Sequence, residues 1–304
     1  MTRLSRSLLY VPASKPAMIQ KAAASAADLV CIDLEDAVAP QDKVASRGHV
    51  VQALKELNFG RRTRVVRING LETPFAYRDL VDVVEAAGDR IDVIMVPKVS
   101  SARDVEFVDT MLTQIEANVG LSNRIGIEAQ IETAGGFLHC VGIASSSSRL
   151  EGLVFGAGDY AASMRMPSSA IGEFDANDAL YPGHRWHAVM HTIVAAARVH
   201  GLRCMDGPYA GYTDSAGLER ASRIARALGF DGKQCIHPAQ LAIVNGVFAP
   251  SEDEIAKAEA VVRAYEEAVA AGRGAATHDG RMIDAATLRM AQTILERRRL
   301  ASTT

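Results

Sequence analysis

The chain has 304 residues, of which 48% are hydrophobic and 23% are charged, and its formal net charge is −3. These values are typical of a globular protein, and they argue against a nucleic-acid partner or a polybasic membrane-binding surface. Because no segment is long and apolar enough to span a bilayer, and the first apolar run is too short for a signal peptide, we expect a cytoplasmic protein with no membrane partner.

Short apolar runs bounded by Gly or Pro alternate with segments of helical periodicity along most of the chain. The runs predict eight strands, at residues 7–11, 29–33, 63–68, 91–96, within 124–136, within 152–160, at 203–205 and at 232–237. The intervening segments predict helices at residues 17–27, 40–57, 77–87, 102–118, 182–200 and 218–228. This order over about 235 residues predicts an α/β fold of the (β/α)8 TIM-barrel type. A doubly wound sheet is the alternative, but no Gly-x-Gly-x-x-Gly turn follows the first strand.

The barrel is expected to occupy residues 1–238 and a helical extension residues 239–304. In this extension, a helix is predicted at 252–271 with Ser251 as its N-cap. A flexible loop is predicted at 272–280, and a last helix at 285–299. The four cysteines lie far apart, which fits neither a zinc site nor a disulfide framework, so we expect buried free thiols.

Two stretches, residues 124–136 and 152–160, organise the candidate site. Each is a short apolar run that ends on a carboxylate, Glu132 in the first and Asp159 in the second. Acids that follow parallel strands point into the mouth of the barrel. A buried pair of acids is costly unless a cation lies between them. Hard oxygen ligands favour Mg²⁺, and we expect that ion here.

Charged residues follow most of the predicted strands: Glu35, Asp36, Arg67, Lys98, Glu132, Asp159, Asp206 and His237. This set suits a substrate that carries a carboxylate and an oxygen that ligates metal. Without a metal, the same residues would form a structural salt-bridge cluster. Arg67 alternates with apolar neighbours, so its side chain faces away from theirs. It either points into the mouth or pairs with Glu132.

Several motifs together resemble the citrate lyase β-subunit/malyl-CoA lyase family of the HpcH/HpaI aldolase superfamily. They are Leu9-Tyr-Val-Pro12 with Pro16 and Lys21, Asp33-Leu-Glu-Asp-Ala-Val38, Val66-Arg-Ile-Asn69, Ile131-Glu-Thr133, Gly158-Asp159 and Ile236-His-Pro238. Further segments most resemble the malyl-CoA/β-methylmalyl-CoA lyase branch: Phe155-Gly-Ala-Gly-Asp-Tyr-Ala-Ala-Ser-Met164, Tyr181-Pro-Gly183, Trp186-His187 and Asp206-Gly-Pro-Tyr209. The match runs nearly end to end.

This resemblance implies a TIM-barrel enzyme that depends on Mg²⁺, with Mn²⁺ as a substitute, and that cleaves 3-hydroxyacyl-CoA thioesters as a homo-oligomer, a trimer or a hexamer. Residue by residue, it implies that Glu132 and Asp159 ligate the metal. It also implies that Arg67 binds the substrate's oxygens, with Glu132 beside it in the substrate site. Glu35 and Asp36 would orient water molecules on the metal.

The resemblance also assigns three residues outside this cluster. Lys15 and Lys21 match basic positions that hold the phosphates of coenzyme A. Solvated helix surface is the alternative for both lysines. Asp284 matches an aspartate that a neighbouring subunit's lid delivers as acid/base. Asp284 is also suited to be the N-cap of the last helix, and the two roles are compatible.

We therefore expect a Mg²⁺-dependent carbon–carbon lyase that converts malyl-CoA or β-methylmalyl-CoA to glyoxylate and acetyl-CoA or propionyl-CoA, or runs the reverse reaction. Three related activities remain as alternatives: a citramalyl-CoA lyase that releases pyruvate, a malyl-CoA thioesterase, and a citrate lyase subunit that acts on an acyl carrier protein within a complex. A structural protein without a metal is the alternative outside enzymology.

Overall fold

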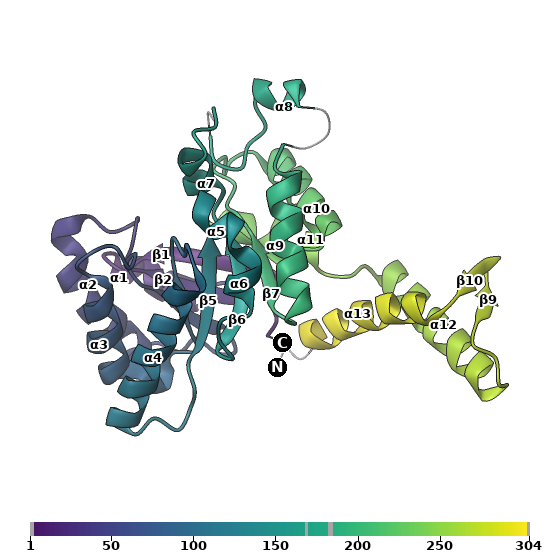
Figure 1. Ribbon diagram of the computed structural model, residues 1–304, viewed down its shortest axis with the longest axis horizontal. Helices are drawn as coiled ribbons and strands as arrows, with labels where there is room; N and C mark the ends of the chain where they lie inside the picture. The colour runs from purple at the N-terminus through teal and green to yellow at the C-terminus, as the bar shows by residue number, and fades with distance from the viewer. Residues whose placement is uncertain (1–2, 168–169, 182–184, 303–304) are drawn as a thin grey trace. The chain divides into compact units, whose positions relative to one another are not determined.

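The computed structural model describes residues 3–167, 170–181 and 185–302 (Figure 1). It divides the chain into two compact units, Ser5–Gly246 and the described residues of Val247–Thr304 with Met1–Leu4. The domain division predicted from the sequence, between residues 238 and 239, stays a prediction. No helix of the described ranges has the length and hydropathy needed to cross a membrane.

Eight parallel strands form a closed barrel in the first unit, which confirms the predicted fold class. The strands are β1 (Ser7–Pro12), β2 (Leu29–Asp33), β3 (Thr63–Arg67), β4 (Val93–Val96), β5 (Gly126–Ile131), β6 (Leu150–Phe155), β7 (Arg203–Asp206) and β8 (Gly232–Cys235). Each strand pairs with the next one along the chain, and β8 pairs with β1 to close the ring. Parallel pairing places the carboxyl ends of all eight strands at one mouth.

Helices follow the strands and lie outside them (Figure 1). In chain order they are α1 (Pro16–Ala23), η1 (Pro40–Asp42), α2 (Lys43–Glu56), α3 (Ala76–Ala87), η2 (Gly88–Arg90), α4 (Ala102–Val119), α5 (Ala134–Leu138), α6 (Cys140–Ala144), α7 (Ala157–Ser163), α8 (Ala176–Leu180), α9 (His187–Val199), α10 (Ser215–Leu228), η3 (Pro238–Gln240) and α11 (Leu241–Phe248). Pro40 starts a 3₁₀ turn ahead of α2. The predicted start of the helix at 182–200, and the last two residues of the motif Tyr181-Pro-Gly183, lie outside the described residues.

An apolar cluster lies in the interior of the barrel below its mouth. Eight side chains from six strands form one fully buried cluster: Leu8, Leu29, Cys31, Val65, Val93, Met95, Val154 and Met205. Contacts between strands that are not neighbours can form only inside the barrel, so this cluster fills the lumen. Side chains in a strand alternate between its two faces. Inward-facing positions beyond the cluster therefore bring Asp33, Arg67 and Gln130 to the mouth. All four cysteines are buried and free, as predicted.

The second unit contains α12 (Glu252–Ala270), β9 (Ala276–His278), β10 (Arg281–Ile283) and α13 (Ala285–Ser302). Ser251 caps α12 as predicted: its hydroxyl accepts a hydrogen bond from the Glu254 N–H, at 3.2 Å. The loop predicted at 272–280 is wrong in part, because β9 and β10 pair as an antiparallel hairpin. Asp279 and Gly280 join the strands, and both have positive φ, 49° and 70°. An Asp-Gly pair is typical of two-residue hairpin turns, so the sequence carried this signal.

Closure of the barrel depends on the absence of a side chain at Gly232, the first residue of β8. A Cβ there would overlap the carbonyl oxygens of Ser5 and Arg6, which are backbone atoms that cannot move independently of β1. We expect Gly232→Ala to lower the free energy of unfolding by about 1–3 kcal/mol, as overpacking does. Urea unfolding measures this change. Gly48→Ala is the control: in α2 a Cβ meets nothing within 4 Å, and the exchange should stabilise by about 0.5–1 kcal/mol. Equal effects of both substitutions would contradict the explanation.

Candidate metal and substrate site at the barrel mouth

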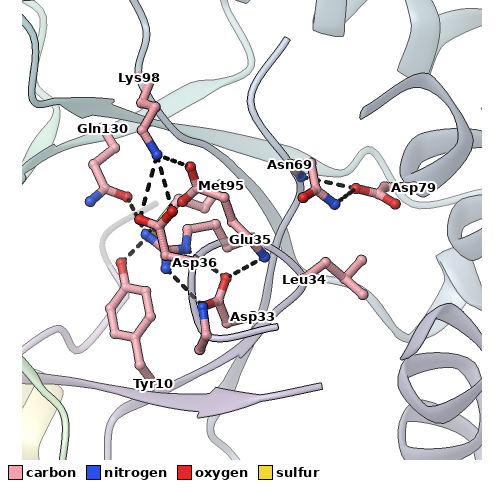
Figure 2. A network of polar contacts seen from close by, with 12 residues as sticks. Tyr10, Asp33, Leu34, Glu35, Asp36, Asn69, Asp79, Met95, Lys98 and Gln130 are labelled. Atoms are coloured by element: carbon pink, nitrogen blue, oxygen red, sulfur yellow. Dashed lines mark hydrogen bonds and ion pairs between the residues drawn. The ribbon is translucent and has the colours of Figure 1, made fainter. Parts of the chain in front are cut away.

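A network of polar and charged side chains joins the carboxyl ends of four consecutive strands, and Figure 2 shows its part around Asp33, Glu35, Lys98 and Gln130. Asp33 ends β2, Arg67 ends β3, Lys98 follows β4 and Glu132 follows β5. Asp33 and Arg67 are opposite each other in the β2–β3 register. The network therefore assembles from residues up to 99 positions apart only because their strands are neighbours in the barrel.

Arg67 is held by two acids. Its Nε and Nη2 atoms donate to the two carboxylate oxygens of Asp33, each at 2.7 Å, and its Nη1 lies 3.0 Å from Glu35 Oε2. The guanidinium carbon lies 5.0 Å from the centre of the Tyr10 ring. Burial opposes ionisation of Asp33, but the charge and hydrogen bonds of Arg67 outweigh it and lower the pKa of Asp33. The hypothesis that Arg67 pairs with Glu132 is therefore wrong, because Asp33 and Glu35 occupy that role.

Lys98 links the segment after β4 to the segment after β2. Its Nζ atom donates to Glu35 and lies 3.3 Å from Asp36 Oδ1 (Figure 2). Its backbone has a φ of 51°, in the left-handed region that Lys seldom adopts. Burial alone would lower the pKa of Lys98, but the hydrogen bond and charge of Glu35 raise it, so the side chain stays a cation. Glu35 thus shares its carboxylate between Lys98 and Arg67, while Asp36 is mostly exposed.

Glu132 is 1% exposed, and both of its oxygens have donors. Oε1 accepts the backbone N–H of Lys98 at 2.8 Å, and Oε2 accepts the side-chain amide of Gln130 at 2.7 Å. Burial, together with the negative charges of Glu35 and Asp159, raises the pKa of Glu132 to about 8, although Arg67 acts to lower it. Gly156 leaves room for this side chain, because a Cβ there would overlap Glu132 Oε2. Such a site favours a cation.

Asp159 does not end a strand, which corrects the sequence-based interpretation. β6 ends at Phe155, and Asp159 lies in the first turn of α7, where it is partly exposed. Gly156 breaks the apolar run between strand and helix. The charge of Asp159 nevertheless raises the pKa values of both Glu132 and Lys98, so the predicted pair of acids is close enough to interact electrostatically.

The residues present fit a hard divalent cation. Their donors are carboxylate oxygens, and the local charge around buried Glu132 is negative. Among the described ranges, no group of three or more His, Cys, Asp or Glu side chains is arranged to hold a metal. A two-carboxylate site suits Mg²⁺ in particular, because this ion keeps several water or substrate oxygens in its coordination shell.

The remaining predicted residues have no described contact with this network. Lys15 and Lys21 are exposed, Lys15 immediately before α1 and Lys21 in its last turn. Asp284 belongs to the second unit and caps α13, because its Oδ1 accepts the Thr287 N–H at 2.8 Å. This hydrogen bond and a second one from the Thr287 hydroxyl lower the pKa of Asp284. The N-cap role expected for Asp284 is confirmed.

Sequence reasoning missed three residues of the network, Tyr10, Asp33 and Gln130. The signal was strand alternation: Asp33 is in phase with Cys31, and Gln130 is in phase with Glu132. Two other predicted residues have separate contacts: Asp206, the last residue of β7, pairs with Lys233 at 2.6 Å, and exposed His237, which follows β8, stacks on Tyr212 with ring centres 4.8 Å apart.

Comparison with known proteins gives a consistent result along the whole chain. A model of the HpcH/HpaI aldolase/citrate lyase family matches residues 6–238. The chain is 43% identical to the L-malyl-CoA/beta-methylmalyl-CoA lyase of Cereibacter sphaeroides, with 99% of this chain and 96% of the relative covered. It is 39% identical to a (3S)-malyl-CoA thioesterase of that species, covering 92% and 89%. The crystal structure of CitE from Mycobacterium tuberculosis in complex with magnesium, acetoacetate and coenzyme A has a TM-score of 0.75, 31% identity, and coverage of 96% and 97%.

We expect the metal-free protein to lose stability as the pH rises from about 4.5 to about 8, and Glu132→Gln to remove most of this slope. The folded pKa of Glu132 is about 8, above its ordinary 4.5, so the folded state keeps a proton that the unfolded state releases in this window. Stability falls with rising pH wherever the folded state binds more protons. Urea unfolding in EDTA at several pH values measures the slope.

At pH 8, Glu132→Gln should be more stable than the wild type by on the order of a few kcal/mol, because Gln cannot ionise. Glu106→Gln, at an exposed position on α4, is the matched control and should keep the wild-type slope. A slope that persists in Glu132→Gln would contradict the electrostatic interpretation.

Proposed function

The chain belongs to the HpcH/HpaI aldolase/citrate lyase family, and from this membership we propose that it is a Mg²⁺-dependent carbon–carbon lyase acting on a 3-hydroxyacyl-CoA. Malyl-CoA and β-methylmalyl-CoA are its substrates. Cleavage yields glyoxylate with acetyl-CoA or propionyl-CoA, and condensation reverses it. The observation that carries this function is the 43% identity, over nearly the whole of both chains, to an enzyme named for these two thioesters.

Glu132 and Asp159 would hold the Mg²⁺, and Mn²⁺ would substitute for it. Support comes from the buried carboxylate of Glu132, whose pKa is raised next to Asp159 and Glu35 and which a cation would stabilise. When bound, Mg²⁺ supplies a positive charge that stabilises negative charge on the substrate's oxygens. Glu35 and Asp36 would accept hydrogen bonds from water molecules near this ion, which fixes their orientation.

Arg67 would bind the oxygens of the substrate. Its donation to Asp33 at 2.7 Å from two nitrogens, and the Tyr10 ring against its face, hold the guanidinium in one orientation. A guanidinium has five N–H donors, and the described contacts use only one of the two on Nη2. A preorganised donor of this kind stabilises the negative charge that develops on an enolate without reorganising.

Asp284 would exchange the proton of the thioester's α-carbon. In the cleavage direction its carboxyl would donate a proton to the enolate, and in the condensation direction its carboxylate would remove one. The hydrogen bonds that lower its pKa favour the carboxylate, which is the form needed for condensation. Within a homo-oligomer, a trimer or a hexamer, the second unit of one subunit would deliver Asp284 as a lid to the barrel of its neighbour.

Lys15 and Lys21 would bind the phosphates of coenzyme A. Both ammonium groups are exposed around α1, which follows the first barrel strand and so begins at the mouth. The buried free thiols suit a reducing compartment, and we propose that the enzyme works in the cytoplasm. A malyl-CoA thioesterase is the second candidate function, supported by the 39% identity to a protein of that name.

Incubation with malyl-CoA, β-methylmalyl-CoA and citramalyl-CoA, in Mg²⁺ or in EDTA, tests the reaction directly. We expect glyoxylate from the first two substrates in Mg²⁺ only, and at least about a 100-fold loss of rate in Glu132→Gln and Asp159→Asn. Chromatography of the thioesters and assay of the keto acids separate the outcomes. Pyruvate from citramalyl-CoA alone would reassign the substrate. Free coenzyme A with intact malate would establish the thioesterase, and no turnover of any thioester would contradict the free-CoA enzyme.

Mixing two inactive variants tests whether Asp284 acts across subunits. Asp284→Asn chains and Glu132→Gln chains should each lack activity, whereas co-refolded mixtures should recover about a quarter of it, because that share of sites combines two intact halves. Asp279→Asn, in the hairpin turn of the same unit, is the control and should stay active alone. Mixtures that remain inactive would place both residues in the site of one chain.

A further inference from the structure

Gln130 contacts both Glu132, the proposed metal ligand, and Arg67, the proposed substrate-binding arginine. It is 3% exposed, inside the barrel, and two residues before Glu132 on the same face of the chain. Its Nε2 donates to Glu132 Oε2 at 2.7 Å, and its Oε1 lies 3.5 Å from Arg67 Nη1. We propose that Gln130 is a positioning residue that orients Glu132 toward the metal and keeps it from pairing with Arg67; this inference rests on the proposed metal-dependent function.

The partners of Glu132 and Arg67 differ in a way that supports this role. The hydrogen-bond donors described for Glu132 are both neutral, the Lys98 backbone N–H and the Gln130 amide. The strong contacts of Arg67 are both anionic, with Asp33 and Glu35. Without a spacer, an arginine and a glutamate this close would form an ion pair, and the glutamate's charge would no longer be free for a metal. Gln130 separates the two charges with an uncharged group.

Only an amide meets both neighbours at this position. In its ionised, metal-binding form the Glu132 carboxylate only accepts hydrogen bonds, so the NH₂ group of Gln130 must face it in that state. A guanidinium donates and cannot accept, so the carbonyl group must face Arg67. The contact with Arg67 is at the limit of hydrogen-bond length, so the bond to Glu132 is the stronger of the two. The acceptor on Glu132 and the donor on Arg67 therefore determine the orientation of the Gln130 amide.

Lys98 and Gly156 also restrict the position of the Glu132 carboxylate. The Lys98 N–H reaches Oε1 from a backbone with a φ of 51°, a conformation that costs energy for a residue with a side chain. Gly156 lies against Oε2 with no room for a Cβ. One oxygen is thus set by Lys98 and the other by Gln130. Loss of Gln130 frees the carboxylate to rotate toward Arg67, which weakens metal binding without touching the metal.

Titration of metal-free full-length protein with Mn²⁺, followed by the electron paramagnetic resonance signal of free Mn²⁺, tests this role without using activity. Gln130→Met keeps the length of the side chain and removes both polar groups. Gln130→Asn keeps an amide but is one methylene too short to reach Glu132. We expect both variants to raise the Kd for Mn²⁺ by about tenfold or more, as loss of a partner of a metal ligand does. In kinetics, kcat should recover at saturating Mg²⁺, with KM for the thioester nearly unchanged.

Gln240→Met is the matched control. Gln240 is 1% exposed, and its amide bonds only backbone groups, the Tyr209 carbonyl and the Ile236 and His237 N–H groups. It should lower thermal stability in EDTA but leave the Kd for Mn²⁺ within about twofold of the wild type. Wild-type affinity in Gln130→Met, or an equal loss in Gln240→Met, would overturn the positioning role. Wild-type protein that binds no Mn²⁺ would overturn the metal-dependent function itself, which is a distinct result.

Discussion

The buried guanidinium of Arg67 is the constraint on which the rest of the site depends. An arginine inside a barrel is tolerated only with carboxylates against it, and Asp33 and Glu35 provide them. These acids fix the orientation of Arg67 but bring further negative charge to the mouth. Lys98 offsets part of that charge by bridging Glu35 and Asp36. The consequence is an arginine that is rigid before the substrate arrives.

Glu132 is the acid that this network leaves without a cation among its hydrogen-bond donors. The neutral groups of Gln130 and Lys98 hold its two oxygens, and Glu35 and Asp159 repel its charge. The charge of Arg67 acts on Glu132 from beyond hydrogen-bond contact and does not offset its burial. The ionised carboxylate is therefore unfavourable in the metal-free state, and a divalent ion in direct contact would reverse that balance. Part of the free energy of metal binding therefore comes from relieving this repulsion. The same neighbours that make the ionised Glu132 unfavourable without a metal make it a suitable metal ligand.

The family relationship indicates the class of substrate, and the geometry of the barrel mouth indicates which chemical groups are available to act on it. Identity of 43% to a malyl-CoA/beta-methylmalyl-CoA lyase, and 39% to a malyl-CoA thioesterase, indicates one class of thioester with two chemical outcomes. The barrel mouth supplies a rigid guanidinium and a buried carboxylate that would suit a metal, and both reactions could use them. Exclusion of water from the thioester carbonyl then separates a lyase from a hydrolase. The proposed delivery of Asp284 as a lid would provide such exclusion.

By itself the sequence determined the barrel, the metal-ligand candidates and the caps at Ser251 and Asp284, because strand length, alternation and capping depend on residues close together in the chain. The Asp-Gly turn of the β9–β10 hairpin was equally local and was overlooked. Only the tertiary structure decided that Arg67 pairs with Asp33 and Glu35, that Asp159 lies on a helix, and that Gln130 separates Arg67 from Glu132. Such contacts depend on which strands are neighbours and how far each side chain reaches across the lumen, and periodicity carries no information about either.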